Sequence, residues 1–140
     1  MHRLHLPEPL NASAPAFADP ASAEAWLAVL APQSGEDALA AILEQIEALD
    51  ASTLPPPQTI ALLNLLRSAA VTRQAITEDS FTRKALPMLP EEERAFDVAQ
   101  QLWTRLGVAY LRLAPQCTPA NRCLPLLRAA TAFRVADHCH

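Results

Sequence analysis

The segment from residue 90 to residue 113 repeats its apolar side chains with the period of an α-helix. Pro90 is followed by three consecutive glutamates, a pattern typical of a helix start, because proline fits the first position and acids favour the positive end of the helix dipole. From Ala95 to Leu113 the apolar side chains recur every three or four residues, and most charged ones fall on the other side. An amphipathic helix of this length must bury its apolar face, so the segment predicts a packed helical fold.

The residue types elsewhere in the chain favour the same fold class. Alanine and leucine, which are strong helix formers, number 28 and 22, whereas valine and isoleucine together number nine. Glycine occurs only at Gly35 and Gly107, so turns with a positive φ must be few. We expect an all-α, single-domain helical bundle of about five amphipathic helices over residues 19–140. Residues 1–18, rich in Pro and Ala without periodicity, are expected to form a flexible or loosely docked N-terminal arm.

Start signals and apolar spacing predict the individual helices. Asp19 before Pro20 is typical of an N-cap followed by the first helical residue. The expected helix starts are Pro20, Ser34, Pro57, Pro90 and either Pro119 or Pro125. The third helix either continues to about Lys84 or breaks near residues 77–79. In the last helix, one face collects Leu124, Leu127, Ala130 and Phe133.

The stretch LPPPQTIALLNLLR, residues 54–67, admits three interpretations. The three prolines suggest a proline-rich ligand, but they lack the Pro-x-x-Pro period and a flanking basic residue. The leucines fit a Leu-x-x-Leu-Leu docking helix, whose leucines would be exposed in the free protein. Burying leucine contributes roughly 1.5–3 kcal/mol per side chain, so a small domain gains more by keeping them inside. We therefore favour the start of a buried helix.

A second motif lies in the helix that begins at Pro90. Residues 103–110 match the Trp-x2-Leu-Gly-x2-Tyr opening of a tetratricopeptide repeat, in which the glycine lets a second helix approach closely. No second copy lies upstream at the repeat distance, and Pro119 and Pro125 fall where the partner helix should be continuous. We favour a single helix packed closely at Gly107, and a tetratricopeptide-like helical scaffold remains an alternative.

The sequence offers little for catalysis or for cofactor binding. All four histidines lie near the ends of the chain, and no glycine-rich phosphate loop occurs. Cys117, Cys123 and Cys139, beside His138 and His140, do not have the spacing of a zinc site. We therefore expect no enzyme activity, no cofactor and no metal, and we expect free thiols.

Charge and hydropathy bound the partners and the location. Five arginines against one acid in residues 98–140 are too few, without interleaved aromatics, for a nucleic-acid surface. No apolar run approaches membrane-spanning length, and the N-terminus lacks the apolar segment of a signal peptide. We expect a cytoplasmic protein that binds neither nucleic acid nor membrane.

The order of features from Leu49 to Leu113 resembles a known kind of protein. It runs Leu-Asp, LPPPQTIALLNLLR, Gln74, a Leu-Pro-x-Leu-Pro linker and LWTRLGVAYLRLA. This order resembles the all-helical N-terminal region of larger, poorly characterised proteobacterial proteins, some of them associated with cyclic-di-GMP signalling through a separate PilZ-type domain. The resemblance covers about half of the chain and implies the N-terminal module of a longer protein. It brings no ligand residues, because the Arg-x3-Arg and Asp-x-Ser-x2-Gly elements of PilZ domains are absent here.

The expected function is that of a bacterial protein–protein interaction or regulatory domain without catalytic activity. Val108 and Leu111 fall towards the polar side of their helix, where Arg105 and Arg112 flank them. These four residues are the predicted partner face, which would bind a protein partner or a second copy of the chain, with a homodimer plausible. The alternative is a small-molecule sensor whose aromatic-lined pocket would be formed by Trp26, Trp103 and Tyr110.

Overall fold

The computed structural model describes residues 14–33, 35–84 and 90–138, and every regular element in these ranges is helical. The α-helices are α1 (Pro20–Leu30), α2 (Gly35–Ala51), α3 (Pro56–Lys84), α4 (Pro90–Leu113) and α5 (Cys123–His138). Two short 3₁₀ turns, η1 (Ala114–Gln116) and η2 (Pro119–Asn121), connect α4 to α5. The prediction of an all-α bundle with five helices is confirmed.

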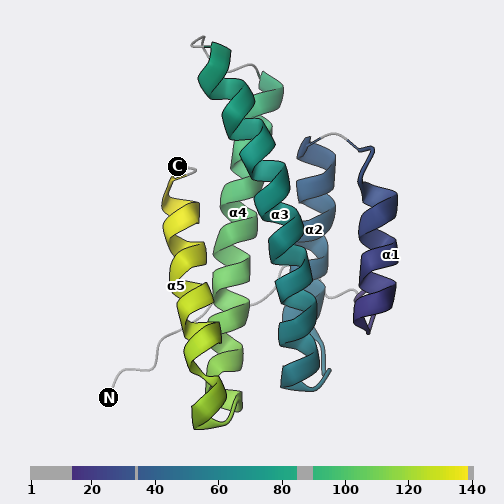
Figure 1. Cartoon of the computed structure of the whole chain (residues 1–140), viewed down its shortest axis with the longest axis vertical. Coiled ribbons are helices and arrows are strands. Elements are labelled where there is room, and N and C mark those ends of the chain that lie inside the picture. Colours follow the sequence, from purple (N-terminus) through teal and green to yellow (C-terminus); the bar gives the residue numbers. More distant parts are fainter. Residues whose placement is uncertain (1–13, 34, 85–89, 139–140) are drawn as a thin grey trace.

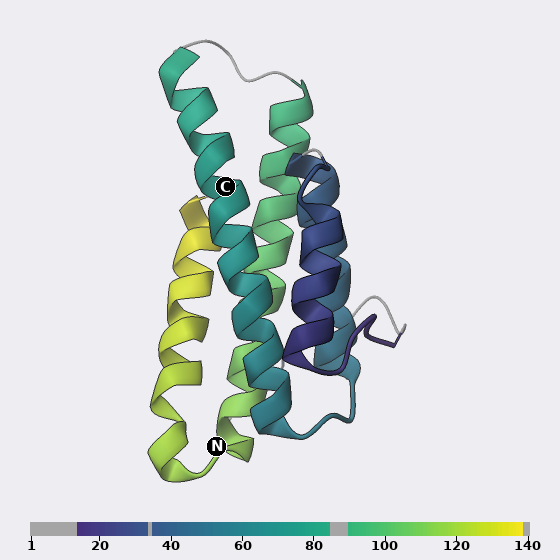
Figure 2. The same cartoon turned by 45° about the vertical axis from the view of Figure 1, so that its right-hand side comes forward.

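The helices run alternately up and down, and α4 lies between α2 and α5 (Figure 1). On the other side of the bundle, α3 packs against α2, α4 and α1. The last helix, α5, packs along α4 and against the two 3₁₀ turns, antiparallel to α4 (Figures 1 and 2). The centre of the fold is therefore formed by α2, α3 and α4, while α1 and α5 each cover one flank.

The helix starts follow the local signals in the sequence. A side-chain oxygen of Asp19 accepts a hydrogen bond from the backbone N–H of Ser22 at 2.9 Å, which makes Asp19 the N-cap of α1 as predicted. The start of α4 at Pro90 is also confirmed, and α3 begins at Pro56, one residue before the predicted position. Of the two predicted courses for α3, the uninterrupted one to Lys84 is observed.

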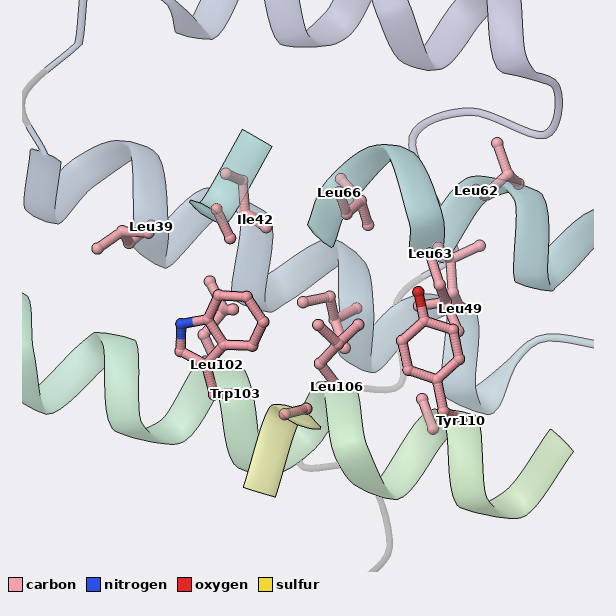
Figure 3. Close-up of a cluster of buried hydrophobic side chains, with 14 of the residues drawn as sticks. Leu39, Ile42, Leu49, Leu62, Leu63, Leu66, Leu102, Trp103, Leu106 and Tyr110 are labelled. Atoms are coloured by element: carbon pink, nitrogen blue, oxygen red, sulfur yellow. The ribbon is translucent and has the colours of Figure 1, made fainter. Parts of the chain in front are cut away.

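Leucines from the three central helices fill the core (Figure 3). Its largest fully buried side chains are Leu39, Ile42, Ile46, Leu49, Thr59, Leu62, Leu63, Leu66, Leu102, Trp103, Leu106 and Tyr110. Leu62, Leu63 and Leu66 belong to the LLNLLR stretch, and Leu65 beside them is partly buried against the same cluster. The interpretation of that stretch as the start of a buried helix is confirmed.

The buried face of α5 differs from the leucine-bearing face noted in the sequence. The helix buries Pro125, Ala129, Ala132 and Ala136, whereas Leu124 and Leu127 are exposed. A Cβ atom placed on Gly107 of α4 would lie 2.8 Å from the ring of Phe133, so this ring of α5 packs directly on the glycine. The alanines of α5 face inwards and its leucines remain outside.

The first helix is attached to α3 at both of its ends. Near the start of α1, the side-chain amide of Gln58 donates to the carbonyl oxygen of Ala18. At the other end, Arg73 donates to the last carbonyl oxygens of the helix and of the turn after it, those of Leu30, Ala31 and Gln33. Much of the predicted arm, residues 1–18, lies outside the described residues, but Phe17 is buried against Trp26, with ring centroids 5.4 Å apart.

Candidate partner-binding surface

Only part of the predicted partner face is exposed. Val108 is 3% exposed, and Leu111 is partly buried against the core, so the expectation of an exposed apolar pair is wrong. Both α2 and α5 pack against α4, so α4 has neighbours on more sides than its own apolar face.

The two arginines of the predicted face are half-buried. Arg112 forms an ion pair with Asp50 of α2, with its Nε 2.9 Å from Oδ1 of the aspartate. The carboxylate side chain is only 5% exposed, so this pair joins α4 to α2 within the fold. Arg105 also interacts with its surroundings. A role for either arginine in binding a partner stays a prediction.

The aromatic residues of the alternative pocket are divided between two parts of the bundle. Trp103 and Tyr110 lie about two turns apart on α4 and are fully packed in the core (Figure 3). Trp26 lies on α1, which packs against α3, and its ring contacts Phe17. None of the three aromatic residues lines the cleft between the starts of α3 and α5 or the cavity beside the end of α2.

Tyr110 forms a polar contact between α4 and α3. Its hydroxyl donates a hydrogen bond to Oδ1 of Asn64 at 2.6 Å. Burial raises the pKa of Tyr110 to about 12, because the phenolate would lose its hydration. The charges of Arg128 and Arg67, together with a hydrogen bond from Arg128, offset part of this rise. Both guanidinium groups therefore lie close to the tyrosine hydroxyl.

Arg67 of α3 and Arg128 of α5, called the arginine pair below, are both half-buried. The Nε atom of each is buried and has no hydrogen-bond partner. Among the described residues, no carboxylate forms an ion pair with either side chain. Two guanidinium groups without a counter-charge, on facing helices, form a site that favours an anionic group.

An apolar cleft of about 490 Å³ lies at the end of the bundle where α3 begins and α5 begins. It is lined by Pro56, Pro57, Ile60, Gln116, Cys117, Thr118, Ala120, Asn121, Cys123, Leu124 and Pro125. Leu124, which lines the cleft, is 47% exposed, and α5 also exposes Leu126 at 45% and Leu127 at 63%. Exposed leucines on one helix are typical of a surface that another molecule covers.

Sequence reasoning missed this surface for a local reason. Leu124 and Leu127 were grouped on one face with Ala130 and Phe133, and a helix with apolar side chains all around it does not show which face is buried. A signal was nevertheless present: alanines at 129, 132 and 136 share one face, which suits close packing against a neighbouring helix. The meeting of Arg67 with Arg128 depends on tertiary packing and has no local signal.

Two further searches over the described ranges gave negative results. No group of three or more His, Cys, Asp or Glu side chains in the described part of the chain could hold a metal ion. Within the same part, every helix is too short or too polar to cross a membrane. Cys139 and His140 lie outside the described residues.

The chain matches a family model described as the N-terminal domain of the cyclic-di-GMP receptor FimW. The match extends over residues 21–139, from the first helix to the end of the last. It confirms the resemblance to an N-terminal helical region associated with cyclic-di-GMP signalling. Neither the curated proteins nor the solved structures contain a match to the chain.

Proposed function

The chain belongs to the family of N-terminal domains of the cyclic-di-GMP receptor FimW, and on that premise we propose that it is the protein-interaction domain of such a bacterial receptor. The family is regulatory rather than catalytic. In this role the helical domain binds another protein, and it contributes no chemistry of its own.

The exposed leucines of α5 are the observation that carries this proposal. Leu126 and Leu127 lie on a helix whose inner face is already occupied by α4, so no further element of the described bundle covers them. Each such side chain gains roughly 1.5–3 kcal/mol when it is fully buried. A partner that covers this face therefore gains a large part of its binding free energy from it.

Packing of the aromatic residues favours this role over small-molecule sensing. Trp103 and Tyr110 are buried in the leucine-rich core, and the hydroxyl of Tyr110 already donates a hydrogen bond to Asn64. A pocket between them would require the core to open. The α5 surface, by contrast, is accessible without any rearrangement.

The test is a substitution that adds a charge to the α5 surface without touching the core. We expect Leu127→Asp in the full-length receptor to remove the protein that can be cross-linked to α5 in bacterial cells, and to remove any self-association seen by light scattering. Val29→Asp is the matched control, because Val29 is 72% exposed on α1, on the opposite flank of the bundle.

Circular dichroism should show that both variants are folded. Unchanged cross-linking and unchanged self-association in folded Leu127→Asp would overturn the proposal. A loss with Arg105→Glu but not with Leu127→Asp would instead place the interaction on the face predicted from the sequence.

A further inference from the structure

The apolar cleft and the arginine pair lie in one line along the facing sides of α3 and α5. On α3, Ile60 lines the cleft, and Asn64 and Arg67 follow it at helical spacing on the same side. On α5, Leu124 lines the cleft and Arg128 follows one turn later. At 1.5 Å per residue, the arginine pair lies about 6–10 Å along the helices from the cleft.

The arginine pair and the cleft lie in a groove whose floor is α4 and whose two walls are α3 and α5. Tyr110 of α4 contacts Asn64 on one wall and is close to Arg128 on the other. Figure 1 shows α4 between α5 and α3, and α5 makes its main contacts with α4 rather than with α3. An elongated ligand can therefore contact both walls at once.

Charge complementarity defines what the ligand must carry. A guanidinium with a buried and unsatisfied Nε loses hydration without gaining a counter-ion, which is unfavourable in the free protein. A carboxylate between Arg67 and Arg128 would accept hydrogen bonds from the terminal nitrogens of both guanidinium groups and would supply the missing counter-charge. The same ligand must place an apolar side chain among Ile60, Leu124 and the prolines of the cleft.

An amphipathic helix meets both requirements. Residues one or two turns apart on a helix share a face and are separated by about the distance between the cleft and the arginine pair. The backbone hydrogen bonds of a helix are satisfied internally, so only its side chains need partners in the groove. A free phosphate group would neutralise the arginine pair but would leave the apolar cleft and the exposed leucines uncovered.

We propose that the groove between α3 and α5 binds an amphipathic helix of a partner protein, with an Asp or Glu of that helix held by Arg67 and Arg128 and an apolar side chain in the cleft. This assignment rests on the interaction role proposed for α5. It adds the chemistry of the partner: an acidic helix with an apolar residue one or two turns from its acid.

The experiment uses the full-length receptor with a photo-reactive amino acid at position 124 in bacterial cells. Mass spectrometry then identifies the cross-linked segment. We expect an amphipathic helix with an acidic residue one or two turns from the cross-link. Arg67→Gln with Arg128→Gln should reduce the cross-link at least tenfold, while Arg134→Gln, which changes an exposed arginine of α5, should not.

A charge exchange gives the decisive result. Arg128→Glu should abolish the cross-link, and replacing the acidic residue of the partner helix by Arg should restore it. A cross-linked segment without an acid, an absent cross-link, or failure of the exchange to restore binding would each overturn the assignment. It would also be overturned if inorganic phosphate, added to the purified receptor, displaced the partner at millimolar concentration, because the arginine pair would then be a phosphate site.

The assignment and the interaction role can fail separately. Loss of partner binding in Leu127→Asp, with no effect of the arginine substitutions, would leave the interaction role standing and reject the groove. No effect of either set of substitutions would reject both.

Discussion

The ring of Phe133 packs against Gly107 so closely that a Cβ atom at position 107 would lie 2.8 Å from Cε1 of the ring. A Cβ atom essentially never comes this near to another side chain, so the absence of a side chain at position 107 makes room for the ring. The cost of that arrangement is the lower helix propensity of glycine, about 1 kcal/mol relative to alanine. The position of the Phe133 ring thus depends on one missing methyl group.

Whether Gly107→Ala raises or lowers the free energy of unfolding should therefore depend on the side chain at position 133. With Phe133 present, overpacking of about 1–3 kcal/mol exceeds the gain in helix propensity, and the variant should be less stable. In a Phe133→Ala background the clash is absent, and Gly107→Ala should stabilise the protein by up to about 1 kcal/mol. Urea unfolding of the four proteins measures both effects. The same sign in both backgrounds would show that the ring does not crowd a side chain at position 107.

The stability should fall at high pH because of Tyr110. Its pKa is about 12 in the folded protein against 10.0 when unfolded, so the folded state holds its proton more strongly. This contribution is complete below pH 10 and is lost as the pH rises from 10 towards 12, by an amount on the order of 2–3 kcal/mol at 1.4 kcal/mol per pH unit.

Tyr110 is the only tyrosine of the chain, so the tyrosinate absorbance reports its ionisation directly. Tyr110→Phe is the control, since it keeps the ring and removes the ionisable group. The stability of this variant should depend less on pH over the same interval. A titration midpoint near 10 in the native protein would contradict the burial of the hydroxyl.

Two arginine–carboxylate pairs on the same side of the bundle should differ in their contributions to stability. Arg112 pairs with Asp50, whose side chain is 5% exposed, whereas Arg94 pairs with Glu36 and both side chains are at least 33% exposed. Arg112→Ala removes the ion pair from a largely buried carboxylate and should cost about 2–3 kcal/mol, with part of the full penalty screened by solvent near the arginine. Arg94→Ala should cost under about 1 kcal/mol.

Equal effects of the two substitutions in thermal unfolding would indicate that Asp50 finds another donor or becomes hydrated. Arg112→Lys provides a further comparison, because it keeps the charge but loses the planar guanidinium, and it should restore part of the stability.

Arg67→Met should leave the free protein at least as stable as the wild type. The buried Nε of Arg67 has no hydrogen-bond partner, so an apolar side chain of similar length removes an unsatisfied group, with an expected change of about 0–1 kcal/mol in favour of folding. Differential scanning calorimetry of the two proteins measures the change. A large loss of stability would mean that Arg67 has a structural partner, which would argue against its being held open for a ligand.

Local rules predicted the starts and the inner face of the central helices. Asp19 and Pro20 cap α1, and Pro90 begins α4, because caps depend on a few neighbouring residues. The LLNLLR stretch was predicted to be buried because its leucines form a single continuous face on α3, and it is buried. Where one face of a helix is clearly apolar and the other clearly polar, periodicity is sufficient.

Periodicity fails where a helix has two apolar faces or receives a neighbour on its polar side. Leucines and alanines occupy different sides of α5, and its packing on α4 buries the alanines. Val108 looked exposed because its own helix places it near polar residues, but α4 is packed by both α2 and α5, and Val108 is buried. The arginine pair joins residues 61 positions apart in the chain, from 67 to 128, so no local pattern could have brought them together.

The hydrogen bonds that attach the two ends of α1 to α3 constrain the number of residues in α1. Gln58 and Arg73 are 15 positions apart on α3, which is about 22 Å along the helix axis. They donate hydrogen bonds to the carbonyl oxygens of Ala18 and Ala31, which flank α1 and are 13 positions apart. Removing one residue from α1 would shorten it by about 1.5 Å and turn everything beyond the deletion by about 100°. One of the two hydrogen-bonded attachments, at Ala18 or at Ala31, would then be lost. Drift in the sequence of α1 is thus tolerable wherever its contacts are kept, while insertions and deletions are not.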